Sequence, residues 1–124
     1  MIALETSSMI AYLSGDVGTD IDALDNAMQL HESAFPPVVL TELLSDHALS
    51  IQTVAFLLQI PQLQIMDGYW QRAGGLRAEI LRRGFKAHLA DTLIAQSCLD
   101  HDVPLITRDR DFRHFARYAG LRLR

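Results

Sequence analysis

Residues 88–112 of the chain read HLADTLIAQSCLDHDVPLITRDRDF. Apolar residues in the first half recur at helical spacing, and the run that follows, VPLIT, is typical of a buried strand. Asp91 falls in the first turn of the predicted helix, and Asp109 falls just after the strand. A well-buried helix that leads into a buried strand predicts an α/β fold with a parallel sheet.

The start of the chain has a similar strand–helix junction. Residues 1–13, MIALETSSMIAYL, predict a short strand at 2–4 and then a helix capped by Thr6 or Ser7. Glu5 lies between these two elements, where an acid is costly to bury without a partner. This residue is therefore expected to have a specific role.

A third junction lies at residues 37–40, PVVL, which predict a buried parallel strand with Glu42 directly behind it. In open parallel sheets, ligands bind outside the carboxyl ends of the strands. Glu5, Glu42 and Asp109 are therefore expected to meet at that edge.

The rest of the sequence continues the alternation of helices and strands. The further elements predicted are a helix capped by Asp20, two short helices within 41–59, a strand over Leu63–Met66, a helix over Trp70–Arg83 closed by Gly84, a short helical turn at RDRDF and an edge strand at LRL near the end. No linker or repeat divides the chain, so we expect one domain.

Composition excludes several classes of protein. With 49% apolar and 21% charged residues, the chain is globular rather than disordered. No apolar run approaches the roughly 20 residues that span a bilayer, and the first residues do not resemble a signal peptide. A single cysteine, Cys98, fits a reducing cytoplasm and is expected to be a core residue.

Charge is divided unevenly along the chain. Residues 1–71 contain nine acids and no Lys or Arg, whereas residues 72–124 contain all eleven cations and six acids. The asymmetry is consistent with a basic surface for polyanions beside an acidic site, and equally with cations on exposed helix faces.

Four acids are candidates for a shared site: Glu5, Glu42, Asp91 and Asp109. Carboxylates in one cleft repel each other unless cations are present, and oxygen ligands without Cys or paired His suit Mg²⁺ or Mn²⁺. One or two such ions would support hydrolysis of a phosphodiester. Taken singly, most of these acids have ordinary explanations as helix N-terminal or turn residues, so the joint pattern carries the prediction.

The chain resembles PIN-domain proteins, and more closely the VapC-type toxins of VapBC toxin–antitoxin pairs, over essentially its whole length. The resemblance rests on MIALETSSMIAYL, VVLTELL, AGGLRAEILRRG and residues 88–112, where the eighteen-residue step from Asp91 to Asp109 is the most specific feature. It implies a single three-layer α/β/α domain over residues 1–124 with a central, mainly parallel sheet. It also implies a Mg²⁺- or Mn²⁺-dependent endoribonuclease, usually a homodimer, that is inhibited by a small antitoxin and cleaves an RNA such as tRNA.

Carried over onto this sequence, the resemblance assigns metal binding and catalysis to Glu5, Glu42, Asp91 and Asp109. It adds three supporting residues: Thr6, Thr107 and Asp111. Five cations beside the third and fourth acids are candidates for contacts with the RNA backbone: Arg82, Arg83, Lys86, Arg108 and Arg110. Exposed helix charges, or pairing with an acidic antitoxin tail, are the alternatives for these cations.

One residue departs from the family pattern. The first acid of the family is characteristically Asp, in a pattern like LDTS, whereas this chain has Glu5. The extra methylene moves the carboxylate by about 1.5 Å in a site that requires near-octahedral ligands, and a misplacement of about 1 Å costs roughly 100-fold in rate. Two hypotheses remain, a working endoribonuclease and a weakened or silenced PIN-like protein that acts through antitoxin or RNA binding. A receiver domain is disfavoured, because the chain lacks its paired acids after the first strand and its late Lys.

Overall fold

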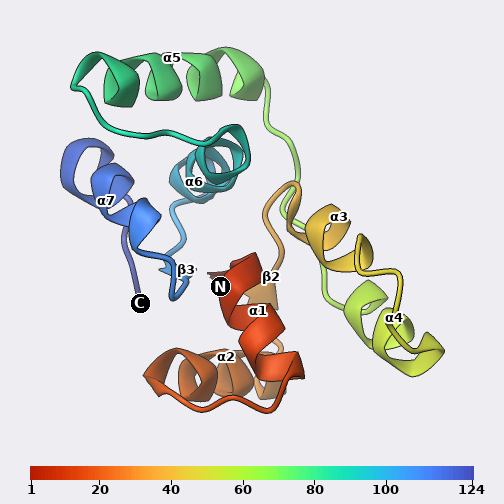
Figure 1. The fold of residues 1–124 in the computed structure, drawn as a ribbon. Helices are drawn as coiled ribbons and strands as arrows, with labels where there is room; N and C mark the ends of the chain where they lie inside the picture. Colours follow the sequence, from red (N-terminus) through yellow and green to blue (C-terminus); the bar gives the residue numbers. More distant parts are fainter.

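A short parallel sheet forms the centre of the computed structural model, which describes all residues, 1–124 (Figure 1). The central strand β1 (Ile2–Leu4) lies between β2 (Ser33–Ala34) and β3 (Leu105–Ile106), and it pairs in parallel with both. All residues of the three strands are buried. Such uniformly apolar or small strands are expected where helices cover both faces of a sheet.

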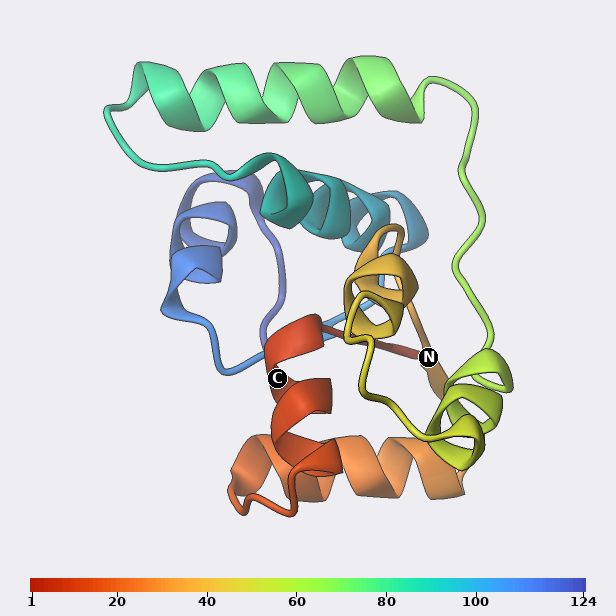
Figure 2. The same ribbon diagram turned by 45° about the vertical axis from the view of Figure 1, so that its right-hand side comes forward.

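Helices surround this sheet. They are α1 (Thr6–Leu13), α2 (Thr19–Gln29), α3 (Val39–Leu44), α4 (Ile51–Leu58), α5 (Tyr69–Arg82), α6 (Leu89–His101) and α7 (Arg113–Ala119), with a 3-10 turn η1 at Arg110–Phe112. In Figures 1 and 2, α1 and α2 lie on one side of the strands, and α6 and α7 lie on the other with α5 stacked outside α6. The α/β/α architecture with a parallel sheet is confirmed. None of the helices combines the length and hydropathy needed to cross a membrane.

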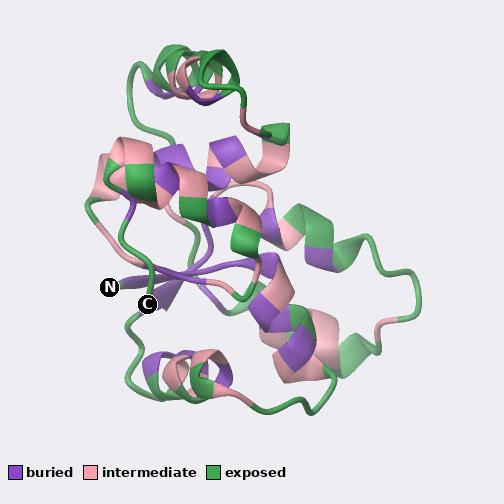
Figure 3. Cartoon of the chain, turned by 60° about the vertical axis from the view of Figure 1, so that its left-hand side comes forward, coloured by how far each residue is buried: buried purple, intermediate pink, exposed green.

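Buried residues gather on the strands and on the helix faces turned toward them (Figure 3). Leu4, Leu105 and Ile106 on the sheet are fully buried, as are Met9 of α1 and Ile94 of α6. Each large apolar side chain buried in this way contributes about 1.5–3 kcal/mol. Cys98 is 1% exposed, so the prediction that it is a core residue is confirmed.

The predicted strand at PVVL (37–40) is wrong. The strand of this region is β2, which ends before Pro36. Proline has no N–H to donate to a ladder, so the two consecutive prolines, Pro36 and Pro37, prevent further pairing. Val38 then adopts a left-handed backbone (φ 71°), which is rare for a β-branched residue, and α3 begins directly after it.

The apolar run after the prolines belongs to a buried helix instead. Val39 and Leu43, four residues apart, both face the core from α3. Glu42 therefore lies within α3 rather than at the end of a strand. Continuous apolar runs of this length do not distinguish a buried strand from a buried helix.

The predicted strand at Leu63–Met66 is also wrong. Only one isolated bridge forms here, between Phe35 and Gln62, and the Leu63 N–H donates to the Phe35 carbonyl. Pro36 follows Phe35 and offers no further donor, so the ladder stops. At the other edge of the sheet, the predicted strand LRL is reduced to one bridge between Leu123 and Leu105.

Two predicted helix caps are wrong as well. The cap of α1 is the side chain of Glu5, which accepts the N–H of Ser7, rather than Thr6 or Ser7 itself. The residue before α2 is Gly18, which provides no side-chain cap, and Asp20 lies inside the helix. Glu5 caps α1 and also contacts Thr107, and Asp20 contacts Arg108. Local sequence patterns do not report such distant contacts.

Gly84 and Gly75 provide a matched test of backbone conformation. Gly84 ends α5 with φ 86°, and a Cβ added there would meet no atom within 4 Å, so only the backbone opposes a larger residue. We expect Gly84→Ala to lower the free energy of unfolding by about 1 kcal/mol. Gly75 lies inside α5, also with open space, so Gly75→Ala should raise it by about 0.5–1 kcal/mol. Urea unfolding measures both; two changes of the same sign would contradict the expectation.

Candidate metal centre

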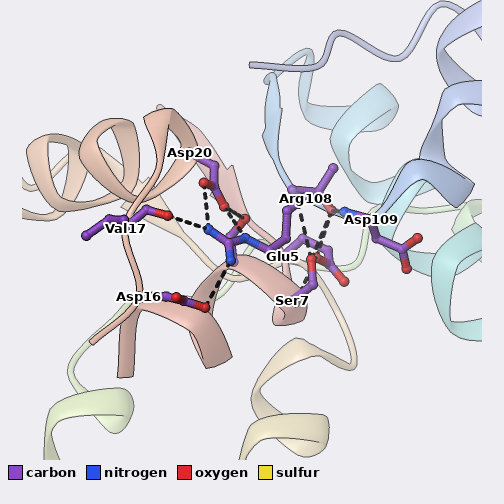
Figure 4. Close-up of polar contacts among 9 residues, drawn as sticks. Glu5, Ser7, Asp16, Val17, Asp20, Arg108 and Asp109 are labelled. Atoms are coloured by element: carbon purple, nitrogen blue, oxygen red, sulfur yellow. Dashed lines mark hydrogen bonds and ion pairs between the residues drawn. The ribbon is translucent and has the colours of Figure 1, made fainter. Parts of the chain in front are cut away.

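Glu5 is a buried carboxylate at the junction of β1 and α1, with only 4% of its surface exposed. Its backbone N–H donates to the carbonyl of Ile106 at 3.0 Å, so the ends of β1 and β3 are joined. Its Oε2 atom accepts hydrogen bonds from the Ser7 N–H at 2.8 Å, from the Thr107 hydroxyl at 2.8 Å and from the Ser7 hydroxyl. Figure 4 shows this arrangement, in which Ser7 of α1 faces the loop after β3.

The environment of Glu5 raises the pKa of its carboxyl above the ordinary value. Burial raises the pKa of Glu5, and the nearby charge of Asp109 raises it further, while the hydrogen bonds from Ser7 and Thr107 oppose these effects. The donors therefore compensate only part of the cost of burying this carboxylate.

Three other acids form a compact carboxylate cluster: Asp91, Asp109 and Asp111. Asp91 lies in the first turn of α6, Asp109 precedes η1, and Asp111 lies within it. Asp109 accepts the N–H of Asp111 at 2.9 Å, which fixes their relative position. One carboxylate oxygen from each residue lies within 4.8 Å of the other two. All three are partly exposed, as a site open to a hydrated cation requires.

The cluster and Glu5 share one electrostatic environment. Burial, together with the nearby charges of Asp109 and Glu5, raises the pKa of Asp91 to about 6, while His88 opposes the rise. His88 Nε2 lies 3.8 Å from a carboxylate oxygen of Asp111. A divalent cation would relieve the repulsion among these acids, and an all-carboxylate donor set suits Mg²⁺ or Mn²⁺.

Glu42 lies beside this group rather than within it. It is exposed on α3, and its Oε1 accepts the hydroxyl hydrogen of Thr6 at 2.6 Å. Thr6 follows Glu5 in the chain, so Glu42 contacts the neighbour of the buried carboxylate and not Glu5 itself. Of the four predicted acids, Asp91 and Asp109 belong to the carboxylate cluster. Glu5 lies near enough for its charge to raise the pKa of Asp91. Glu42 is linked to this region only by its hydrogen bond with Thr6.

Sequence reasoning placed Asp111 among the supporting residues, whereas the structure places it in the carboxylate cluster itself. The available signal was the spacing of two acids, two residues apart, in the turn after a buried strand. In that geometry the first acid, Asp109, caps the turn and the second, Asp111, faces the same way.

The predicted RNA-contacting cations lie in different environments. Arg82 and Arg83 both pair with Glu79 on α5, and Lys86 is exposed without an ion pair. Arg110 is exposed and lines a cavity of about 380 Å³ next to Asp109. Arg108 also borders this cavity, but its guanidinium binds carboxylates of the α1–α2 region.

Fold and site together describe an α/β protein with a candidate divalent-cation centre at the carboxyl end of a parallel sheet. Residues 2–118 match the PIN domain family, so the chain belongs to the PIN-domain family. No curated protein sequence gives a significant match to the chain.

Two solved structures have a similar fold. One is VapBC-5 of the VapBC family of toxin–antitoxin systems from Mycobacterium tuberculosis, with 22% identity, a TM-score of 0.68 and coverage of 98% of this chain and 95% of that chain. The other is VapBC2 from Rickettsia felis, bound to a DNA fragment from their promoter, with 21% identity, a TM-score of 0.73 and coverage of 100% and 98%.

The raised pKa of Asp91 predicts a pH-dependent stability difference. The pKa rises from 3.8 to about 6 in the fold, so Asp91 contributes stability that is fully present below pH 3.8 and is lost as the pH rises through about 6. Without metal, Asp91→Asn should be more stable than the unchanged chain at pH 8 by about 1–2 kcal/mol, a figure reduced for solvent screening. The advantage should vanish at pH 4.

Urea unfolding at the two pH values, with and without Mn²⁺, measures this difference. Added Mn²⁺ should stabilise the unchanged chain at pH 8 and have little effect on Asp91→Asn. Asp67→Asn, at an exposed acid outside the site, is the control and should show neither effect. An Asp91→Asn protein that is less stable than the unchanged chain at pH 8 without metal would contradict the repulsion described above.

Proposed function

We propose that this protein is a Mg²⁺- or Mn²⁺-dependent endoribonuclease and the toxin of a toxin–antitoxin pair. The observation that carries the proposal is the carboxylate cluster with Glu5 beside it, at the edge of the sheet where parallel α/β folds bind ligands. Membership of the PIN-domain family and the resemblance to VapC-type toxins support the same reaction class.

The carboxylates of Asp91, Asp109 and Asp111 would hold one or two cations. A bound ion of this kind neutralises phosphate charge and lowers the pKa of a coordinated water. The Oε2 atom of Glu5 is occupied by Ser7 and Thr107, whereas Oε1 accepts no hydrogen bond from the protein and remains for a cation. Thr107 holds Glu5 and also accepts the Asp109 N–H at 3.0 Å, so one hydroxyl aligns two acids.

Glu42 would act at the rim of the site, where Thr6 fixes its carboxylate. The exposed cations Arg110 and Lys86 would attract the RNA backbone, because phosphate contacts position a nucleic acid without reading its sequence. Arg82 and Arg83 remain candidates for weaker, longer-range attraction. The substrate class is RNA, with tRNA as the example that the family resemblance suggests.

We also propose a cytoplasmic location, a homodimer and a small antitoxin as partner. These proposals rest on the family resemblance, and the two structures of similar fold come from VapBC toxin–antitoxin systems. The single, buried Cys98 agrees with a reducing compartment.

A second candidate function is a weakened or silenced PIN-like protein that acts through binding. The hydrogen bonding of Glu5 favours this second candidate, because the side chain caps α1 and one of its oxygens accepts three hydrogen bonds from the protein. An aspartate would cap the helix in the ordinary way, since Asp is among the preferred capping residues. The shorter side chain would also place its second oxygen differently from Oε1 of Glu5.

Cleavage of total RNA with Mn²⁺ or Mg²⁺ tests both candidates. We expect the unchanged chain to cleave RNA and Asp91→Ala to lose at least about 100-fold in rate, because the cluster would lose a ligand. Glu5→Asp should be as active as the unchanged chain or more so. Asp67→Ala, outside the site, should retain full activity.

The outcomes separate the hypotheses. Cleavage by Glu5→Asp alone would identify the unchanged chain as a silenced form. Absence of cleavage by both proteins at every metal concentration would contradict the nuclease proposal and leave antitoxin or RNA binding as the function to measure.

A further inference from the structure

Arg108 lies between Thr107 and Asp109, two residues of the candidate site, yet its guanidinium points away from the side chain of Asp109 and toward Asp16 and Asp20 (Figure 4). Its Nε and Nη2 atoms donate to the two carboxylate oxygens of Asp20, at 2.8 and 2.9 Å. Two longer bonds of 3.3 Å reach Asp16 and the carbonyl of Val17. The contact with Asp20 is thus bidentate, the geometry in which arginine binds carboxylates most specifically.

Asp20 is well placed to serve as a fixed anchor. Its side chain is only 14% exposed, and it also accepts the hydroxyl hydrogen of Ser8 at 2.8 Å. Hydrogen bonding to Arg108 lowers the pKa of Asp20 to about 2, so the carboxylate stays charged across the neutral range. The anchor therefore joins the first turn of α2, the first turn of α1 and the loop after β3.

Gly18 is a second observation on this ion pair, because its backbone lies in close contact with Asp20 and Arg108. Its φ of 153° is a conformation that other residues rarely adopt. A Cβ at this position would lie 2.6 Å from an oxygen of Asp20 and 3.2 Å from Nη2 of Arg108. A side chain at Gly18 would therefore force Asp20 or Arg108 to shift.

The backbone around Arg108 is linked directly to the acids. The Arg108 N–H donates to the Ser7 hydroxyl at 3.3 Å, and the Asp109 N–H donates to the Thr107 hydroxyl at 3.0 Å. Both hydroxyls in turn hold Glu5. The loop that carries Asp109 is consequently fixed by the Arg108 side chain on one flank and by the Glu5 network on the other.

We propose that Arg108 is a positioning residue, which with Asp20 and Gly18 locks the Thr107–Asp109 loop so that Glu5 and Asp109 face the same cation. This inference rests on the proposed function, and it gives Arg108 a different role from the phosphate contact that its charge predicts. Four of the five guanidinium donors of Arg108 already have carboxylate or carbonyl partners, so the side chain has little left to offer RNA.

The two roles predict opposite effects of Asp20→Asn. If Arg108 positions the loop, loss of the anchor charge weakens the lock and lowers kcat and Mn²⁺ affinity, with KM for RNA nearly unchanged. If Arg108 binds phosphate, Asp20→Asn releases the guanidinium and removes a negative charge, so RNA binds more tightly and with a steeper salt dependence.

The experiment compares Asp20→Asn, Arg108→Lys and Arg108→Gln with the unchanged chain. Asp102→Asn is the matched control, because Asp102 pairs with Arg122 on the exposed surface away from the site and has a left-handed backbone that Asn tolerates. Three readouts are used: amide hydrogen exchange at Ser7, Arg108 and Asp109, Mn²⁺ affinity by calorimetry, and binding of a labelled single-stranded RNA in EDTA at several salt concentrations. The first and third do not require cleavage.

We expect the three amides to exchange at least about 10-fold faster in all three variants than in the unchanged chain, because opening of the loop becomes easier. Mn²⁺ affinity should fall by about 10-fold, as for other residues that orient metal ligands. Arg108→Lys should resemble Arg108→Gln, because lysine cannot form the bidentate pair. The salt dependence of RNA binding should stay unchanged, whereas loss of one phosphate contact would change its slope by about 0.7.

Unchanged amide exchange in the three variants would overturn the proposal, whatever the activity. A salt slope reduced in Arg108→Gln but retained in Arg108→Lys would overturn it in favour of a phosphate contact. If the unchanged chain cleaves no RNA, the nuclease proposal fails separately, and amide exchange together with Mn²⁺ affinity still decides the role of Arg108.

Discussion

The buried carboxylate of Glu5 is the constraint on which the rest of the site depends. A charged group at the end of the central strand is tolerated only when donors surround it, and here these come from α1 and from the loop after β3. Its own N–H bonds to Ile106, so the backbone and the side chain of one residue join β1 to β3. The same contacts that compensate its burial also place Thr107 and Asp109 at the sheet edge.

The acidic and basic halves of the sequence form different parts of the fold. The acidic first half forms β1, β2 and the helices up to α4, and the basic second half supplies α5, α7 and the loop after β3. The carboxylate cluster belongs to the basic half, where Arg110 and His88 lie near it. Arg108 and Asp20 connect the two halves through an ion pair, so charge contributes to assembly of the site as well as to its chemistry.

Repulsion among the acids is the feature of the fold that a bound cation would relieve. Packing could have separated Asp91 from Asp109, yet burial and mutual charge raise the pKa of Asp91 to about 6. Perturbed groups of this kind concentrate at functional sites, where a cation or proton completes the structure. The repulsion lowers stability without metal, and under the proposed function the same arrangement would give a set of oxygen ligands already in place.

The sequence by itself determined the α/β class, the long helices α5 and α6, and strands β1 and β3, and it named candidate acids for the site. Periodicity and the placement of acids at segment ends are local properties. It could not determine whether PVVL forms a helix or a strand, because an apolar run suits a buried helix and a buried strand equally. The two prolines exclude the strand only because they cannot donate hydrogen bonds to a neighbouring strand. It also could not show that Asp111 joins the cluster or that Arg108 faces Asp20. Those pairings join residues 20 and 88 positions apart, and only the tertiary structure brings such residues within hydrogen-bond or ligand distance.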